Sequence, residues 1–118
     1  MGTMHRIFVF GTLQEGHRNF HVNRGTRVGD HWITAQPHPL YVIGPRRLPW
    51  LLNRPGQGVQ VIGQLYAVDD ATLADMDRLE RLDDPLWYER RQIAVRPHPG
   101  PADAPAETVW VYFGSEAG

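Results

Sequence analysis

The stretch VQVIGQLYAVDDATLADMDRLERL, residues 59–82, contains the two most regular patterns of the sequence. In its first part apolar residues alternate between two sides, which predicts a β-strand, and Gly63 indicates a bulge or a close approach of another backbone. Asp69-Asp70 then offers an N-cap, and the apolar spacing that follows predicts a helix over 71–82. The clearest strand therefore leads directly into the only helix that the sequence predicts.

Short apolar runs on either side of this stretch predict further strands, separated by segments rich in proline and glycine. With the strand at 59–68, the expected strands are 7–10, 31–35, 40–43, 91–96 and 108–113, the last two joined by a Pro-rich turn over 97–105. The first is a continuous apolar run, typical of a strand buried on both faces. We expect 44–58 to be a long loop, ordered and packed because of its apolar content. Strands dominate without alternating strictly with helices, which indicates an α+β fold, a small mixed or mostly antiparallel β-barrel with a helix against it.

Size and composition narrow the kind of protein. The 118 residues suit one domain, expected over 1–118, and 42% hydrophobic with 21% charged residues is an ordinary globular balance. A net charge of −1 without a basic cluster argues against nucleic acid as a partner. The absence of cysteine excludes disulfides, thiolate zinc sites and a cysteine nucleophile. No apolar run approaches the roughly 20 residues of a membrane span, and no signal peptide is apparent, so we expect a cytoplasmic protein.

One carboxylate is placed unusually by the helix pattern. Leu73, Met76 and Glu80 fall on the same face, which should point toward the core. Burial would raise the pKa of Glu80, and the nearby charge of Asp77 would act in the same direction. A carboxyl tuned in this way suits general acid–base catalysis. The alternative is a structural Glu80 that pairs with a neighbouring arginine, namely Arg78, Arg81 or Arg90.

The turn after the first strand, Phe10-Gly11-Thr12-Leu13, is a second candidate site. Gly11 lacks a side chain and would let a ligand approach the backbone, and consecutive N–H groups in such a turn can hold an anion. The alternative is an ordinary turn after a strand. His17 and His21 are four residues apart, but the Glu of a helical zinc motif and a third ligand are missing, so no metal site is predicted.

Three blocks of the sequence, taken in order, resemble the γ-glutamyl cyclotransferase-like family over about 6–96 and the final strand. The blocks are Phe8-Val9-Phe10-Gly11-Thr12-Leu13 with Gly16 and Asn19; Leu48-Pro49-Trp50-Leu51-Leu52 with Pro55, Gly56 and Gly58; and Gly63–Asp69 with Leu73, Asp77, Glu80, Pro85, Tyr88 and Arg90. The middle block is similar to the γ-glutamylamine cyclotransferase branch in particular.

This resemblance implies a small mixed β-barrel with flanking helices, no cofactor and Glu80 as the catalytic residue. It also implies that Phe10, Gly11, Thr12 and Leu13 form the substrate-binding loop, and we expect Trp50 and Tyr88 at the same pocket. The family usually has Tyr where this chain has Phe10, so a hydroxyl contact would be lost here, whereas backbone contacts of the loop would survive.

The reaction that the resemblance implies is an intramolecular aminolysis. The α-amino group of a γ-glutamylamine, such as γ-glutamyl-ε-lysine, attacks its own side-chain carbonyl and releases 5-oxoproline and a free amine, with Glu80 as general acid and base. Two alternatives stay open. The substrate could be another γ-glutamyl compound, a dipeptide or an acylated antibiotic intermediate, or the domain could be a non-catalytic module that binds a small molecule.

Overall fold

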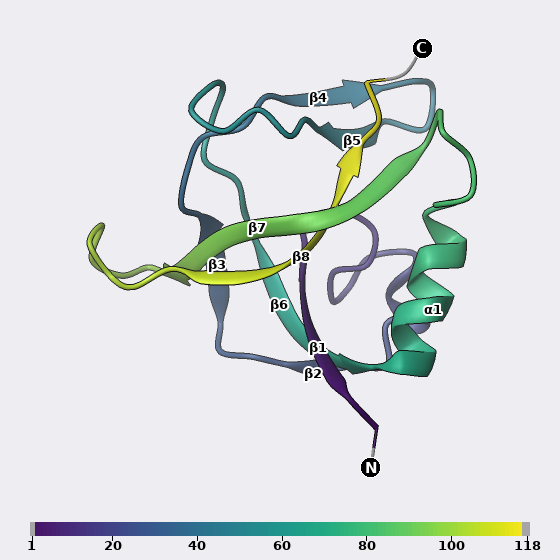
Figure 1. The fold of residues 1–118 in the computed structure, drawn as a ribbon, viewed down its shortest axis with the longest axis horizontal. Coiled ribbons are helices and arrows are strands. Elements are labelled where there is room, and N and C mark those ends of the chain that lie inside the picture. Colours follow the sequence, from purple (N-terminus) through teal and green to yellow (C-terminus); the bar gives the residue numbers. More distant parts are fainter. Residues whose placement is uncertain (1, 117–118) are drawn as a thin grey trace.

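The structure is a computed structural model that describes residues 2–116, and its centre is a closed β-barrel (Figure 1). Five strands form the closed ring in the order β1-β8-β7-β3-β6 and back to β1, and a short strand, β2, adds to β6. Their bounds are β1 Met4–Val9, β2 Thr26–Arg27, β3 His31–Thr34, β6 Ile62–Asp69, β7 Tyr88–His98 and β8 Glu107–Gly114. β1 runs parallel to β8, whereas every other pair in the ring is antiparallel, so the predicted mixed barrel is confirmed. The two-residue strand β2 was not predicted.

Alternation along β1 places its side chains in two different cores. Phe8 packs inside the barrel, whereas Ile7 and Val9 point outward and pack beneath the helix α1, Asp70–Leu79. Both sets are buried because the helix covers the outside of the sheet at this place (Figure 1). The apolar run at the end of β1 therefore follows from burial on both faces, as expected.

Gly63 lies against the end of β1. A Cβ built on Gly63 would stand 2.4 Å from the carbonyl oxygen of Val9 and 2.9 Å from the ring of Phe8. Only a residue without a side chain permits this approach, which confirms the close backbone contact predicted from the sequence.

The helix begins and ends at identifiable residues. Asp69 is the N-cap, and its side chain accepts a hydrogen bond from the Thr72 amide at 2.8 Å. The last helical residue is Leu79, three residues earlier than the spacing predicted, because Arg81 adopts the left-handed conformation with φ of 54°. Glu80 is the C-cap, so it stands at the end of the helix rather than within it.

The segment predicted as a loop over 44–58 contains a strand, and that prediction is wrong in this respect. β5, Leu48–Leu51, pairs antiparallel with β4, Leu40–Ile43, and the hairpin lies across one end of the barrel (Figure 1). Apolar residues of β5 pack on the domain, with Trp50 and Leu51 buried. Pro49 is compatible with β5 because a two-stranded hairpin tolerates proline where no ladder hydrogen bond is needed.

The remaining elements are short. One 3-10 turn, Phe20–Val22, follows the loop after β1. Among residues 2–116, α1 and this turn are the only helices, fewer than the flanking helices that the resemblance implied. Within the same range, no helix is long and apolar enough to cross a membrane.

Candidate active site

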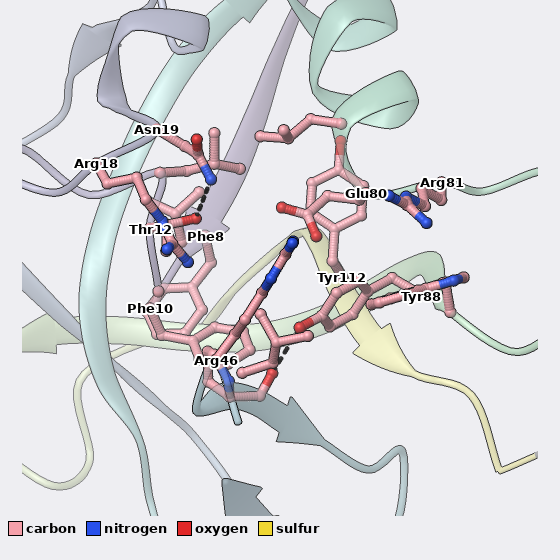
Figure 2. Close-up of a pocket in the computed structure, with 17 residues that line it drawn as sticks. Phe8, Phe10, Thr12, Arg18, Asn19, Arg46, Glu80, Arg81, Tyr88 and Tyr112 are labelled. Carbon is pink, nitrogen blue, oxygen red and sulfur yellow. Dashed lines mark hydrogen bonds between the residues drawn. The ribbon is translucent and has the colours of Figure 1, made fainter. Parts of the chain in front are cut away.

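A cavity of about 330 Å³ lies between the end of α1, the loop after β1, the β4–β5 hairpin and the strands β7 and β8 (Figure 2). We call it the Glu80 cavity. Its walls are formed by Phe8, Val9, Phe10, Gly11, Thr12, Leu13, Arg18, Asn19, Arg46, Leu48, Pro49, Leu79, Glu80, Arg81, Trp87, Tyr88 and Tyr112. Its volume is at the lower end of the range for small-molecule sites. The structure thus brings together six of the seven predicted site residues, all except Trp50.

Glu80 projects its carboxyl into this cavity, with Thr12 and Asn19 on the opposite side (Figure 2). Burial alone raises the pKa of Glu80 from an ordinary 4.5 to about 7. The predicted contribution of Asp77 is not found, and the Asp77 carboxylate instead accepts hydrogen bonds from Arg90 and from the Tyr112 hydroxyl. At neutral pH Glu80 therefore exchanges between its acid and its base form.

The three arginines that the sequence offered as partners of Glu80 are engaged elsewhere. Arg78 pairs with Asp75, Arg90 pairs with Asp77, and Arg81 lies over the Trp87 ring at 4.8 Å. Glu80 forms no ion pair and its side chain no hydrogen bond with any residue in the described range 2–116. The structure therefore contradicts the alternative in which Glu80 is a structural residue held in a salt bridge.

The loop after β1 faces Glu80 with unused backbone donors. Its carbonyls are occupied, since the oxygens of Gly11 and Thr12 accept hydrogen bonds from the amides of Gln14 and Asn19 at 3.1 and 3.0 Å. Over the part of the chain that is described, the amides of Gly11, Thr12 and Leu13 donate to no protein acceptor. Three consecutive amides on a cavity wall can hold an anionic oxygen.

The side chains of the loop explain its rigidity and correct one expectation. The Asn19 side-chain amide donates to the Thr12 hydroxyl at 2.8 Å, which ties the loop to the segment after it (Figure 2). The space beside Gly11 is not open to a ligand, because a Cβ there would meet the Pro49 ring at 2.9 Å. Glycine is thus required by packing against β5. Phe10 stacks on Phe8 with ring centroids 6.1 Å apart.

Two tyrosines close the cavity behind Glu80, and both hydroxyls already have acceptors. Tyr88 donates to the Pro49 carbonyl at 2.9 Å, and Tyr112 donates to Asp77 at 2.7 Å. Burial raises the pKa of both tyrosines above the ordinary value of 10. The Glu80 charge adds to this for Tyr88, and the Asp77 hydrogen bond and charge, followed by the Glu80 charge, add to it for Tyr112. They remain protonated walls of the cavity, and neither hydroxyl donates to Glu80.

Trp50 lies behind Tyr88 and outside the Glu80 cavity. Its ring packs on Tyr88 with centroids 4.7 Å apart, and its indole N–H donates to the Ser115 carbonyl at 3.1 Å.

Sequence reasoning missed Arg18, Arg46 and Tyr112 as wall residues. Alternation marked Tyr112 only as a strand residue, and the two arginines stand in turns where no periodicity points to a site. No cluster of three metal-ligating side chains occurs between residues 2 and 116.

Fold and cavity together define a class of protein, a small mixed barrel in which one unpaired carboxyl shares a cavity with a loop of three free backbone amides. A family model described as gamma-glutamyl cyclotransferase, AIG2-like, matches residues 7–117. The chain belongs to this family, as the three sequence blocks predicted.

Relatives and a solved structure agree with this assignment. Gamma-glutamylaminecyclotransferase of Homo sapiens is 36% identical over 111 residues, which cover 86% of this chain and 71% of the relative. Gamma-glutamylaminecyclotransferase C of Danio rerio is 37% identical over 96 residues, covering 77% and 62%. The crystal structure of an AIG2-like protein from Mus musculus has a TM-score of 0.76 at 32% identity, covering 93% of this chain and 76% of that one. The predicted fold and the prediction of an enzyme family are confirmed, although the chain spans only 62% of the zebrafish relative's length.

Proposed function

We propose that this chain is a γ-glutamylamine cyclotransferase-type enzyme, with Glu80 as its general acid and base. One observation carries the proposal: an unpaired carboxyl with a pKa of about 7 lines the same small cavity as a loop with three unbonded backbone amides. The names of the human and zebrafish relatives support the choice of γ-glutamylamines as substrates. A cytoplasmic location and the absence of a nucleic-acid partner stay predictions from the sequence.

The proposed reaction needs one proton acceptor and no external nucleophile. Glu80 in its ionised form takes a proton from the substrate's α-ammonium group, and the resulting amine attacks the γ-carbonyl carbon. A C–N bond forms and closes the five-membered ring. The bond between that carbon and the leaving nitrogen then breaks as the protonated Glu80 gives its proton to this nitrogen. The second proton that the attacking nitrogen must lose passes to the departing amine, which leaves as an ammonium ion. The products are 5-oxoproline and the free amine, and Glu80 is restored.

The loop after β1 would bind and orient the glutamyl part. The amides of Gly11, Thr12 and Leu13 are proposed to hold the substrate's α-carboxylate or the oxyanion that develops on the γ-carbonyl. Phe10 and Tyr88 would limit the space on either side, so that the substrate keeps the folded rotamer that leads to ring closure. Because the contacts of the loop come from its backbone, Phe10 in place of the family's usual Tyr leaves them unchanged.

The first test is the variant Glu80→Gln, which keeps the shape of the side chain and removes the base. We expect the release of 5-oxoproline from γ-glutamyl-ε-lysine to fall at least about 10²-fold, with an unchanged circular dichroism spectrum. Glu89→Gln is the matched control, since Glu89 is exposed on β7 and does not line the cavity. Turnover near the unaltered rate in Glu80→Gln would contradict the assigned role.

A panel of γ-glutamyl compounds tests the substrate and the open alternatives. We expect γ-glutamylamines to be turned over with higher kcat/KM than γ-glutamyl dipeptides or acylated antibiotic intermediates. The opposite order would move the assignment to another γ-glutamyl compound. If no compound yields 5-oxoproline and one of them binds tightly by calorimetry, the chain is a binding module and the proposal is wrong.

A further inference from the structure

A second cavity adjoins the Glu80 cavity, and the two share part of their walls. It measures about 810 Å³, and its walls are formed by Ile43, Gly44, Pro45, Arg46, Leu48, Trp50, Arg81, Leu86, Trp87 and Ser115. We call it the apolar groove. Arg46, Leu48, Arg81 and Trp87 line both cavities, so a molecule that extends out of one enters the other.

The side chains of the groove suit a hydrocarbon chain. Ile43 and Leu48 come from the two strands of the hairpin, and Leu86 and Trp87 come from the segment between α1 and β7. Leu86 and Ile43 stay exposed in this structure, so apolar surface is left uncovered here. The glutamyl head, with its ammonium and carboxylate groups, would be a poor occupant. The alkyl chain of a leaving amine would cover this surface.

Arg46 is the cation at the junction of the two cavities that has no partner. Arg81, the other arginine at this junction, is held over the Trp87 ring. Arg46 stands in the turn between β4 and β5, and Figure 2 shows its side chain extending into the Glu80 cavity. Within residues 2–116 it forms no ion pair and no hydrogen bond. A guanidinium without a partner at the entrance of a groove is available for an anionic group.

We propose that Arg46 is a specificity-determining residue that binds a carboxylate on the leaving amine, while the alkyl chain of that amine lies in the apolar groove. This inference rests on the proposed cyclotransferase function. Arg46 does not touch the reacting atoms in this arrangement. The planar guanidinium can bind a carboxylate through two parallel hydrogen bonds, which favours an amino-acid leaving group over a plain alkylamine.

Five carbons separate the lysine carboxylate from the nitrogen of the bond that breaks, so in this arrangement its contact with Arg46 is the same in the ground state and in the transition state. Such uniform binding lowers KM and leaves kcat unchanged. The contact is exposed to solvent, and added salt should weaken it. These two properties separate a specificity role from a role in folding or in proton transfer.

The test compares γ-glutamyl-ε-lysine with γ-glutamylcadaverine, which differ only by the carboxylate of the leaving amine. Arg46→Gln is compared with Arg47→Gln, a control that removes the same charge from the adjacent exposed position, which lines neither cavity. In Arg46→Gln we expect KM for the lysine compound to rise about five-fold, with kcat and the cadaverine compound unaffected. Arg47→Gln should match the unaltered protein for both substrates.

The outcomes separate the failure of this inference from the failure of the proposed function. Equal losses on both substrates would mean that Arg46 binds the glutamyl part or supports the fold, which overturns the inference. An unchanged preference in Arg46→Gln overturns it as well, while turnover by the unaltered protein leaves the proposed function standing. If the unaltered protein releases 5-oxoproline from neither compound, the proposed function fails and the inference fails with it.

Discussion

At the scale of the residue, the burial of Glu80 determines both the pKa of its carboxyl and the contribution of this residue to the stability of the fold. The folded protein holds a proton on Glu80 up to a pH of about 7, whereas the unfolded chain releases it near 4.5. Between these values the folded state binds more protons than the unfolded state, so stability falls as the pH rises through this window. The contribution of Glu80 is complete below pH 4.5 and is lost above a pH of about 7. The full displacement corresponds to about 3 kcal/mol.

This linkage predicts a stability gain for the Glu80→Gln variant at high pH. Glu80→Gln cannot ionise, so its free energy of unfolding does not lose this contribution as the pH rises. The difference in free energy of unfolding between the variant and the unaltered protein should therefore be up to about 3 kcal/mol larger at about pH 8 than at about pH 4.5. Urea unfolding at several pH values measures the difference, and other titrating groups cancel because both proteins contain them. A difference that does not change with pH would show that the folded protein leaves the pKa of Glu80 unshifted.

The site was only partly predictable at this scale. Glu80 could be found because helix periodicity places it on the face of Leu73 and Met76, although it proved to be the C-cap. Arg46 could not be found, because a turn residue has no periodicity and its position depends on how the hairpin packs. Trp50 was identified from the correct sequence block, but its ring turns to Tyr88 and away from the Glu80 cavity.

At the scale of the element, α1 fixes Glu80 through its two ends. Asp69 is the last residue of β6 and also the N-cap of the helix, so the strand and the helix join without a loop. The other end is set by Arg81, whose left-handed conformation stops the helix just after Glu80. The register from Asp69 to Glu80 therefore determines where the carboxyl enters the cavity.

Loss of the cap should loosen this element. Asp69→Ala removes the acceptor for the Thr72 amide, and we expect the free energy of unfolding to fall by about 1 kcal/mol near neutral pH. Asp69→Ser retains an oxygen at the same place and should recover most of that loss. The measurement is urea denaturation of both variants beside the unaltered protein. Equal destabilisation by Ala and Ser would show that the cap hydrogen bond is not the cause.

Strands and helices with a clear apolar period were predicted, whereas only β4 of the two strands of the hairpin was predicted. Strand β4 was recognisable from its apolar run, but its side chains are exposed, and β5 was hidden by Pro49 and by neighbouring turn residues. The hairpin forms because β4 and β5 pair. Pairing depends on the partner strand, which the local propensity of a single segment does not reveal.

At the scale of the whole molecule, closure of the barrel depends on β1. This strand pairs with β6 in an antiparallel ladder from Met4 with Asp69 to Val9 with Gln64, and it meets β8 in parallel at Ile7 and Trp110. Both pairings join parts of the chain that are far apart in sequence. Burial of β1 could be read from its apolar run, but its partners could not, because alternation predicts which side chains are buried and not which strands are neighbours.

Closure therefore predicts a large effect for a very small substitution. Gly63→Ala would place a methyl group 2.4 Å from the Val9 carbonyl oxygen and 2.9 Å from the Phe8 ring, so β6 and β1 must move apart. We expect the free energy of unfolding to fall by about 3 kcal/mol, the upper part of the range for an overpacked core. Phe8 and Val9 also line the Glu80 cavity, so the same shift should lower kcat/KM.

The matched control is Gly2→Ala, where no atom lies within 4 Å of the added carbon and the change should stay within about 0.5 kcal/mol. Denaturant unfolding gives the stability of both variants, and 5-oxoproline release gives their activity. A Gly63→Ala protein as stable as the control would mean that β1 and β6 are not in contact at this point. Because β1 carries the Phe10–Leu13 loop into the cavity and β6 carries α1 and Glu80, the ladder between β1 and β6, with the close contact at Gly63, sets the separation of the two halves of the proposed site.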